Sequence, residues 1–290
     1  MFDRYVVVDW SASSSPKTGE NSIWICNLGE AGDPITTNPP TRGKAEAQLR
    51  DLLIDAIDHG ERVLIGFDFP YGYPQGFASA LGLEGPAWSA TWRYLASHVQ
   101  DASPTNENNR FEIASAMNAR LVHHTFWGRP AGRSLSSLSM RRDQVRYKID
   151  DEAPGLGEWR EVEMLLRRRG SHPHSVWKLM GAGSVGSQTL TGIPVLNRLR
   201  YDTRLEAISR VWPFEVVPEL AERRGAVVHA EIWPSLNAIP HQTSLVKDQA
   251  QVIALAQELR HRDRSGTVAR MFIVPWSAVT EEGWILGVVD

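Results

Sequence analysis

The stretch Tyr5-Val-Val-Val-Asp9 guides the interpretation of the whole sequence. An apolar run without polar alternation is typical of a strand buried on both faces, and such strands belong to sheets that helices cover on two sides. The run ends in a carboxylate, Asp9, and the residues after it, Ser11–Pro16, predict a turn. The stretch therefore predicts an α/β protein in which Asp9 closes a central strand.

The segments that follow change between strand-like and helix-like spacing. Apolar residues recur at helical intervals from Lys44 to His59, and Gly60 is expected to end that helix. A run of two or three strands, a helix and a further strand favours a layered α/β architecture. The other predicted elements are strands at Ser22–Cys26, Val63–Phe67, Gly225–Trp233 and Met271–Val274, and a helix from about Ser244 to Arg260.

The middle of the chain differs in charge from its two ends. Between residues 101 and 210 there are 17 Lys and Arg against 12 Asp and Glu, whereas the rest of the chain has 14 against 22. The middle is also rich in turn-forming residues. We therefore expect a discontinuous core made of residues 1–75 and 206–290, with a basic, mostly helical or loop insertion or cap at 76–205.

Composition excludes several classes of protein. The chain has 290 residues and a net charge of −3, so it is not a generally basic protein that coats nucleic acid. A single cysteine, Cys26, excludes a disulfide framework and a cysteine-based zinc site. No apolar run approaches the roughly 18 residues of a membrane span, and no signal peptide is evident. The expected protein is soluble and cytoplasmic, without a membrane partner.

Four carboxylates stand out because they close or interrupt segments that otherwise belong to the core. Asp9, Asp68 and Glu231 follow or end predicted strands, and Asp248 lies in the late helix. Each also has a structural explanation: turn capping for Asp9, a strand-end turn for Asp68, pairing with His229 for Glu231, and a helix-dipole contact for Asp248.

Asp248 is informative because of its place on the helix. Its spacing from the apolar residues of that segment puts it on the face that should pack on the sheet. That face consists of Leu245, Asp248, Val252, Leu255 and Leu259. An isolated carboxylate there destabilises the fold by several kcal/mol unless a partner compensates its charge.

If the four carboxylates converge, their charges need compensation. Asp9 and Asp68 lie at the carboxyl ends of neighbouring strands, where open α/β sheets bind ligands. Like charges a few ångströms apart repel by roughly 4 kcal/mol per pair at an effective dielectric constant near 20. Either some of them are protonated or a cation lies among them, and oxygen ligands alone suit Mg²⁺ or Mn²⁺.

Several short motifs resemble one known family. They are Val8-Asp9-Trp10-Ser11, Gly66-Phe-Asp68-Phe-Pro70, Gly183-Ser-Val-Gly-Ser-Gln188 with Gly192-Ile-Pro194, Glu231-Ile-Trp-Pro234 and Lys247-Asp248. Together they resemble an uncharacterised family labelled predicted RNase H-like nuclease. The resemblance implies a ribonuclease H-like mixed sheet flanked by helices.

The resemblance also implies an activity. It implies two-metal phosphodiester cleavage, in which Asp9 bridges two Mg²⁺ ions and Asp68, Glu231 and Asp248 complete their ligands. Glu46 lies off the apolar stripe of its helix, so Glu231 would replace the helix-borne glutamate usual in ribonuclease H. The expected substrate is nucleic acid or a phosphorylated small molecule. The expected substrate-binding residues are Ser11, Lys247, Gly183 and Ser184.

Two other functions remain open from the sequence. In a small actin-like kinase or ATPase, Asp9–Ser15 and Gly181–Gly186 would be the two phosphate loops. In a non-catalytic module, the same carboxylates would bind a metal or nucleotide without turnover. A dinucleotide fold is disfavoured, because Gly192 and Pro194 are expected to prevent a long helix after the glycine-rich segment.

Basic and aromatic residues give weaker indications. Arg141-Arg142, Arg146–Lys148 and Arg167–Arg169 could follow a phosphate backbone, or form a solvated face on which neighbouring glutamates neutralise Arg167–Arg169. Trp10 and Trp233, next to candidate carboxylates, could stack on a base or fill the core, which is the commoner role.

Overall fold

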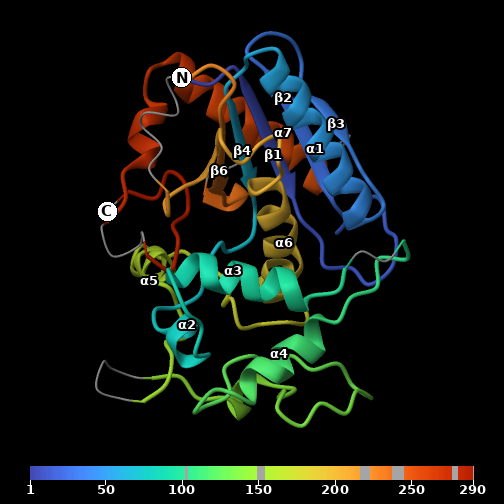
Figure 1. Ribbon diagram of the computed structural model, residues 1–290, viewed down its shortest axis with the longest axis vertical. Coiled ribbons are helices and arrows are strands. Elements are labelled where there is room, and N and C mark those ends of the chain that lie inside the picture. The colour runs from blue at the N-terminus through green and yellow to red at the C-terminus, as the bar shows by residue number, and fades with distance from the viewer. Residues whose placement is uncertain (102–103, 149–153, 216–222, 237–244, 276–279, 290) are drawn as a thin grey trace.

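The computed structural model describes residues 1–101, 104–148, 154–215, 223–236, 245–275 and 280–289 (Figure 1). Its centre is a mixed six-stranded sheet with the order β3-β2-β1-β4-β6-β5. β1 pairs antiparallel with β2 and parallel with β4, and β4, β6 and β5 are mutually parallel. The strands are β1 (Arg4–Asp9), β2 (Trp24–Gly29), β3 (Ile35–Thr37), β4 (Val63–Phe67), β5 (Ser209–Val211) and β6 (Val227–Glu231).

The predicted α/β class is confirmed, and β1, β2, β4 and β6 lie at or close to their predicted positions. The two edge strands were not predicted, because three residues without an apolar run carry no strand signal. The strand predicted at Met271–Val274 is wrong. Val268–Phe272 forms a 3₁₀-helix, η3, which buries Val268 and Met271 on one side and leaves Ile273 59% exposed.

Helices cover both faces of the sheet, as the unbroken apolar run of β1 predicts. Val6 and Val8 point to one face, which α1 (Arg42–Asp58) and α6 (Val185–Arg200) cover. Tyr5 and Val7 point to the other face, which α7 (Lys247–Arg264) covers (Figure 1). The helix predicted from about Ser244 corresponds to α7; Ser244 itself lies outside the described residues.

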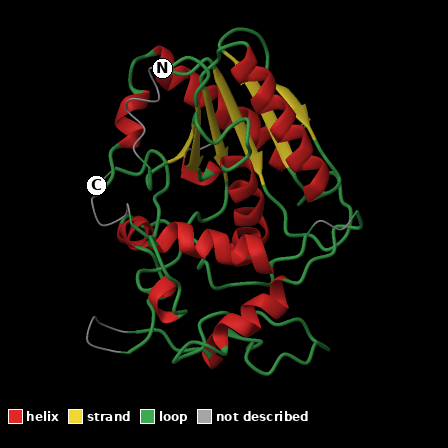
Figure 2. Ribbon diagram, in the orientation of Figure 1, coloured by secondary structure: helices red, strands yellow, loops and turns green. Residues whose placement is uncertain are grey.

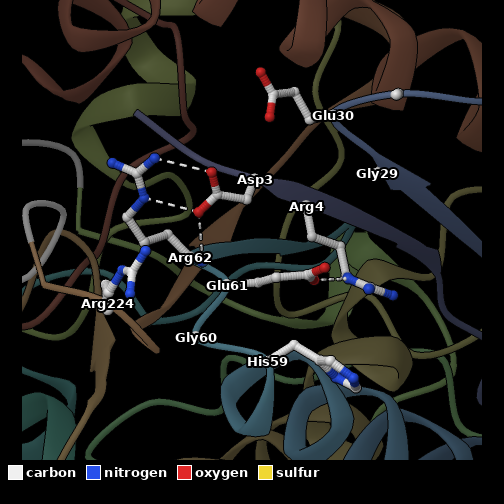
Figure 3. A pocket seen from close by; sticks show the side chains of 10 residues that line it. Asp3, Arg4, Gly29, Glu30, His59, Gly60, Glu61, Arg62 and Arg224 are labelled. Carbon is white, nitrogen blue, oxygen red and sulfur yellow. Dashed lines mark hydrogen bonds and ion pairs between the residues drawn. The ribbon is translucent and has the colours of Figure 1, made fainter.

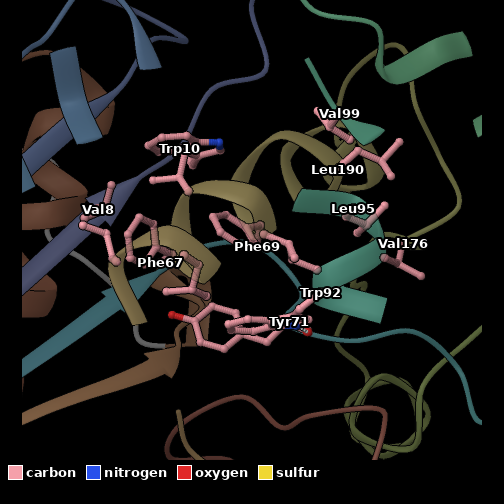
Figure 4. Close-up of a cluster of buried hydrophobic side chains, with 14 of the residues drawn as sticks. Val8, Trp10, Phe67, Phe69, Tyr71, Trp92, Leu95, Val99, Val176 and Leu190 are labelled. Carbon is pink, nitrogen blue, oxygen red and sulfur yellow. Dashed lines mark hydrogen bonds between the residues drawn. The ribbon is translucent and has the colours of Figure 1, made fainter. Parts of the chain in front are cut away.

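The segment 76–205 is built mainly from helices and loops (Figure 2). Its remaining helices are α2 (Phe77–Ala80), α3 (Ala87–His98), α4 (Arg110–Asn118), α5 (Glu161–Arg168) and the 3₁₀-helix η1 (Arg142–Gln144); a further 3₁₀-helix, η2 (Pro234–Leu236), follows β6. α3 packs on α6, and Trp92 and Leu95 join the hydrophobic cluster that covers one sheet face (Figure 4). The segment and the sheet therefore share one hydrophobic core. None of the described helices has the length and apolarity needed to cross a bilayer.

Helix α6 contradicts the expectation that Gly192 and Pro194 prevent a long helix, because it runs through both residues to Arg200. The loss of one backbone donor at Pro194 is outweighed by burial, since most of α6 lies inside the core. Gly192 has a packing reason: a Cβ there would lie 2.3 Å from the ring of Phe69. The helix approaches the segment after β4 that closely only because this position has no side chain.

We therefore expect Gly192→Ala to lower the free energy of unfolding by about 1–3 kcal/mol, because the added methyl group overlaps a buried ring. The matched control is Gly43→Ala in α1, where a Cβ meets nothing within 4 Å. The control should leave stability unchanged or raise it by up to about 1 kcal/mol. Urea unfolding measures both, and equal effects would contradict the packing role of Gly192.

Candidate functional site

Two of the predicted carboxylates meet at the carboxyl ends of β1 and β4. Val8 lies opposite Phe67 in the parallel register, so the next residues, Asp9 and Asp68, fall at the same edge of the sheet. Asp68 accepts hydrogen bonds from the Trp10 backbone N–H (2.7 Å) and from the Gln188 side chain (3.4 Å). Gln188 also donates to the Trp10 carbonyl (2.6 Å), so α6 fixes the ends of both strands.

Asp248 approaches the same site from α7. It is the second residue of that helix and accepts a hydrogen bond from the Asn21 backbone N–H at 2.6 Å. The predicted helical face is confirmed, because Val252, Leu255 and Leu259 are buried against the sheet. Asp248 is the half-buried residue where that face begins.

The electrostatics show that these carboxylates are poorly compensated. Burial raises the pKa of Asp9 well above its usual value, and the charges of Asp68 and Asp248 raise it further, against a smaller opposing effect of Lys247. Burial raises the pKa of Asp68 to about 7, although the hydrogen bonds from Trp10 and Gln188 oppose this. Asp9 and Asp68 thus form a pair that favours bound protons or a cation.

Glu231 is not part of this group. Both its oxygens accept hydrogen bonds from Arg160, at 2.7 and 2.6 Å, and Oε2 also accepts from the Tyr71 backbone N–H. Arg160 is fully buried and also pairs with Glu163 at 2.9 Å. Although burial opposes its charge, the two glutamates hold the Arg160 pKa above its usual value. The charge of Glu231 is therefore compensated within the protein, and not by His229, which contacts Ser209 instead.

Strand alternation puts Glu231 on a different face of the sheet from Asp9 and Asp68, although Glu231 and Asp68 both line one small pocket. Glu231 lies level with Phe67, one residue short of the level of Asp68. Neighbouring residues of a strand point to opposite faces, and Ala230 and Ile232 point to the face that α7 covers. Glu231 therefore points to the opposite face. Asp9 follows Tyr5 and Val7 in strand alternation, and Asp68 follows Leu64 in the same way, so both point to the face that α7 covers.

The residues present fit a hard divalent cation in their chemistry. Asp9, Asp68 and Asp248 offer only oxygen donors, as Mg²⁺ and Mn²⁺ prefer. Among the described residues, however, no three or more His, Cys, Asp or Glu side chains already lie close enough together to hold a metal ion. A cation bound by all three aspartates would require them to lie closer together than they do.

A cleft of about 530 Å³ opens beside these acids. Asp9 and Asp248 line it, and so do three of the four predicted substrate-binding residues, Ser11, Gly183 and Ser184. The fourth, Lys247, is exposed at the start of α7 and is not among the lining residues, but its charge acts on Asp9. Sequence reasoning missed Lys17, Asn21, Arg110 and Gln188, which also line the cleft.

The loops around the cleft are held by buried contacts. The guanidinium of Arg42 is fully buried and donates to the carbonyl of Ser13 at 2.6 Å, which fixes the serine-rich loop. On the other side Gly183 has a φ of +70°, and a Cβ there would lie 2.2 Å from His174. The glycine is therefore needed both for its left-handed backbone and for the close approach of His174. Ser184 then forms the N-cap position of α6.

The other sequence indications have structural outcomes. Trp10 is 1% exposed and packs on Phe67 and Phe69, so it fills the core and cannot stack on a base (Figure 4). Trp233 is half-buried against the cluster under α7. The predicted basic clusters do not line the cleft.

Two glutamates close to Arg167–Arg169 in the sequence, Glu158 and Glu163, pair with other arginines. Glu158 pairs with Arg142 at 2.7 Å, and Glu163 pairs with Arg160. Arg167 instead lies over the ring of Trp159, 4.3 Å from its centroid.

A larger pocket of about 730 Å³ lies at the opposite end of the sheet, where β1 and β4 begin (Figure 3). Its main charges compensate each other: Arg62 binds Asp3 with two hydrogen bonds, and Arg4 binds Glu61. The carboxylate cleft is therefore the better candidate site.

Comparison of the chain with protein-family models, with curated proteins and with solved structures gave no match in any of the three.

The buried pair of Arg160 and Glu231 makes a stability prediction. Arg160→Leu leaves two buried glutamates without a cation, so we expect the free energy of unfolding to fall by about 3–5 kcal/mol. The matched control is Arg204→Leu, which breaks an exposed ion pair. The side chains of Arg204 and its partner Asp58 are 52% and 55% exposed. That change should lower the free energy of unfolding by less than about 1 kcal/mol. If chemical denaturation shows similar losses of stability for Arg160→Leu and Arg204→Leu, the proposed difference between the buried and the exposed pair is wrong.

The raised pKa of Asp68 makes a pH prediction for the metal-free protein. The folded state binds the Asp68 proton more tightly than the unfolded state does. This proton therefore adds to the free energy of unfolding in full below about pH 4, and the contribution is lost as the pH rises through about 7. Relative to Asp68→Asn, which never ionises, the wild type should lose about 2–4 kcal/mol between pH 4 and 8. Urea unfolding in EDTA measures this, with exposed Asp51→Asn as the control. Stability curves of wild type and Asp68→Asn that stay parallel over this range would contradict the raised pKa.

Proposed function

We propose that the protein hydrolyses phosphate esters or phosphodiesters with a divalent cation, Mg²⁺ or Mn²⁺, held by Asp9, Asp68 and Asp248. The observation that carries this proposal is the juxtaposition of Asp9 and Asp68, two incompletely compensated carboxylates at the carboxyl ends of a parallel strand pair, with the charge of Asp248 acting on Asp9 from α7. Uncompensated acids destabilise a fold, and a ligand cation is the ordinary reason for such an arrangement at this edge of an α/β sheet.

The proposal extends to a ribonuclease H-like core. A mixed sheet with helices on both faces is what that fold requires. Its support also includes the positions of the motifs that carry the resemblance. Asp9–Ser11, Gly183, Ser184 and Gln188 line the cleft, Asp68 accepts a hydrogen bond from Gln188, and Asp248 lines the cleft from α7. In this proposal Glu231 has a structural role, because Arg160 occupies both its oxygens.

The residues of the chain have distinct roles in such a reaction. A bound divalent cation would supply an activated water and stabilise negative charge on the phosphoryl oxygens. Asp9 and Asp68 would be ionised in the loaded site, and the Trp10 N–H and Gln188 orient Asp68 toward it. Ser11 and Ser184 line the cleft and offer hydroxyl groups to the polar part of the substrate.

A second function is favoured by one observation. Ser11–Ser13 and Gly181–Ser184, the two segments that an actin-like kinase or ATPase would use as phosphate loops, line the same cleft. ATP binding distinguishes the two functions, because hydrolysis of a phosphate ester does not require it. A module that binds a metal without turnover would show stabilisation by Mg²⁺ and no product.

The proposal is tested with Asp9→Asn, compared with Asp51→Asn as an exposed control. Hydrolysis of single-stranded, duplex and hybrid nucleic acids and of small phosphate esters is measured with Mg²⁺ or Mn²⁺ and with EDTA. We expect Asp9→Asn to lower the rate by about 100-fold or more while the circular dichroism spectrum stays unchanged.

Thermal unfolding provides a readout independent of turnover. At a metal concentration a hundred times the Kd, binding should stabilise the wild type by about 2.7 kcal/mol, and Asp9→Asn should lose most of this gain. If the variant cleaves every tested substrate as well as the wild type, the hydrolase assignment fails.

A further inference from the structure

One residue that lines the cleft carries a guanidinium with no ion-pair partner among the described residues. Arg110, the first residue of α4, lines the cleft together with Gly181–Ser184. Its hydrogen-bond partners are neutral: Nε donates to Ser187 Oγ at 2.9 Å, and Nη1 donates to Asn108 Oδ1 at 2.7 Å and to Ser14 Oγ at 2.9 Å. Within the part of the chain that the structure describes, no carboxylate lies within ion-pair distance of Arg110. The nearest acid on its own helix, Glu112, pairs with Arg133.

The surroundings of Arg110 favour an anion. Burial lowers the pKa of Arg110 to about 10, the positive charges of Arg42 and Arg133 lower it further, and the charge of Glu112 opposes this with a smaller effect. A guanidinium under that influence remains charged at neutral pH, and it gains most from a ligand that brings negative charge. The three hydrogen bonds fix the plane of the group, whereas Nη2 has no hydrogen-bond partner among the described residues. A fixed guanidinium with free donors suits a phosphate oxygen.

We infer that Arg110 binds a phosphate group of the substrate, and that this substrate is a small phosphate ester with a polar remainder such as a sugar or polyol. The inference rests on the proposed function, since it places the phosphate between Arg110 and the aspartates. It deepens that function by separating two tasks: the aspartates act at the reacting phosphorus, and Arg110 positions the substrate.

Size and chemistry of the cleft favour the small ester over a polynucleotide strand. A volume of about 530 Å³ is in the range of small-molecule sites. The lining consists mainly of serine, glycine, amide and charged residues, and its one aromatic residue, Trp10, is buried. Single-stranded nucleic acids are held by stacked aromatic rings and a track of cations, and neither lines this cleft.

The first experiment measures phosphate binding without turnover. Inorganic phosphate is titrated by calorimetry in EDTA into the wild type, Arg110→Gln, Arg110→Lys and the control Arg168→Gln, which changes an exposed arginine of α5. We expect Arg110→Gln to weaken binding about 10-fold or more, Arg110→Lys to weaken it less, and the control to match the wild type. Unchanged affinity in Arg110→Gln, with thermal unfolding showing a folded variant, would overturn the inference.

The second experiment addresses the size of the substrate. Affinities are compared for ribose 5-phosphate, a nucleoside monophosphate and a single-stranded decanucleotide. We expect the decanucleotide to bind no more than about 10-fold tighter than the monophosphate, since the cleft holds one unit. A much tighter decanucleotide complex that weakens steeply with salt would overturn the small-ester assignment.

Asp9→Asn separates failure of this inference from failure of the proposed function. Removal of one negative charge from the cleft should leave phosphate binding in EDTA intact or tighten it. If hydrolysis persists in Asp9→Asn while Arg110→Gln loses phosphate, the proposed function fails and the role of Arg110 stands. If Asp9→Asn abolishes hydrolysis while Arg110→Gln keeps both its KM and its phosphate affinity, the role of Arg110 fails alone.

Discussion

The parallel pairing of β1 with β4 is the constraint on which the candidate site depends. It places Asp9 beside Asp68 whether or not their charges are compensated, because the register is fixed by apolar side chains further along both strands. Burial of those side chains supplies the stability that holds two acids together against their repulsion. The site is thus built by the core, and its raised pKa values follow from that position.

Helix α6 connects this pairing to the rest of the molecule. Gln188 reaches the ends of both strands, and Ser187 accepts a hydrogen bond from Arg110. The same helix crosses Phe69 at Gly192 and begins at the glycine-rich turn that lines the cleft. One motif therefore supplies the contact to Asp68, the close packing and one wall of the cleft, which explains why it combines small and polar residues.

Buried charges occur in the protein in two different states. Arg160, Glu163 and Glu231 form a closed group in which each charge has a partner, and such a group fixes the positions of segments far apart in the sequence. Asp9, Asp68 and Arg110, which are half-buried, have no ion-pair partner among the described residues; Asp9 and Arg110 line one cleft, and Asp68 lies beside Asp9. Charges of the first kind are compensated within the protein, and charges of the second kind are not.

The sequence by itself determined the α/β class, the central strands, the long helices α1 and α7, and the carboxylate at the end of each central strand. These features follow from local periodicity, which burial enforces wherever the segment lies. Only the tertiary structure decided that Glu231 falls one residue out of step with Asp68 and pairs with Arg160, because register depends on the partner strand. The continuation of α6 through Pro194 and the position of Arg110 beside the cleft were likewise decided by packing between distant segments, which no local pattern records.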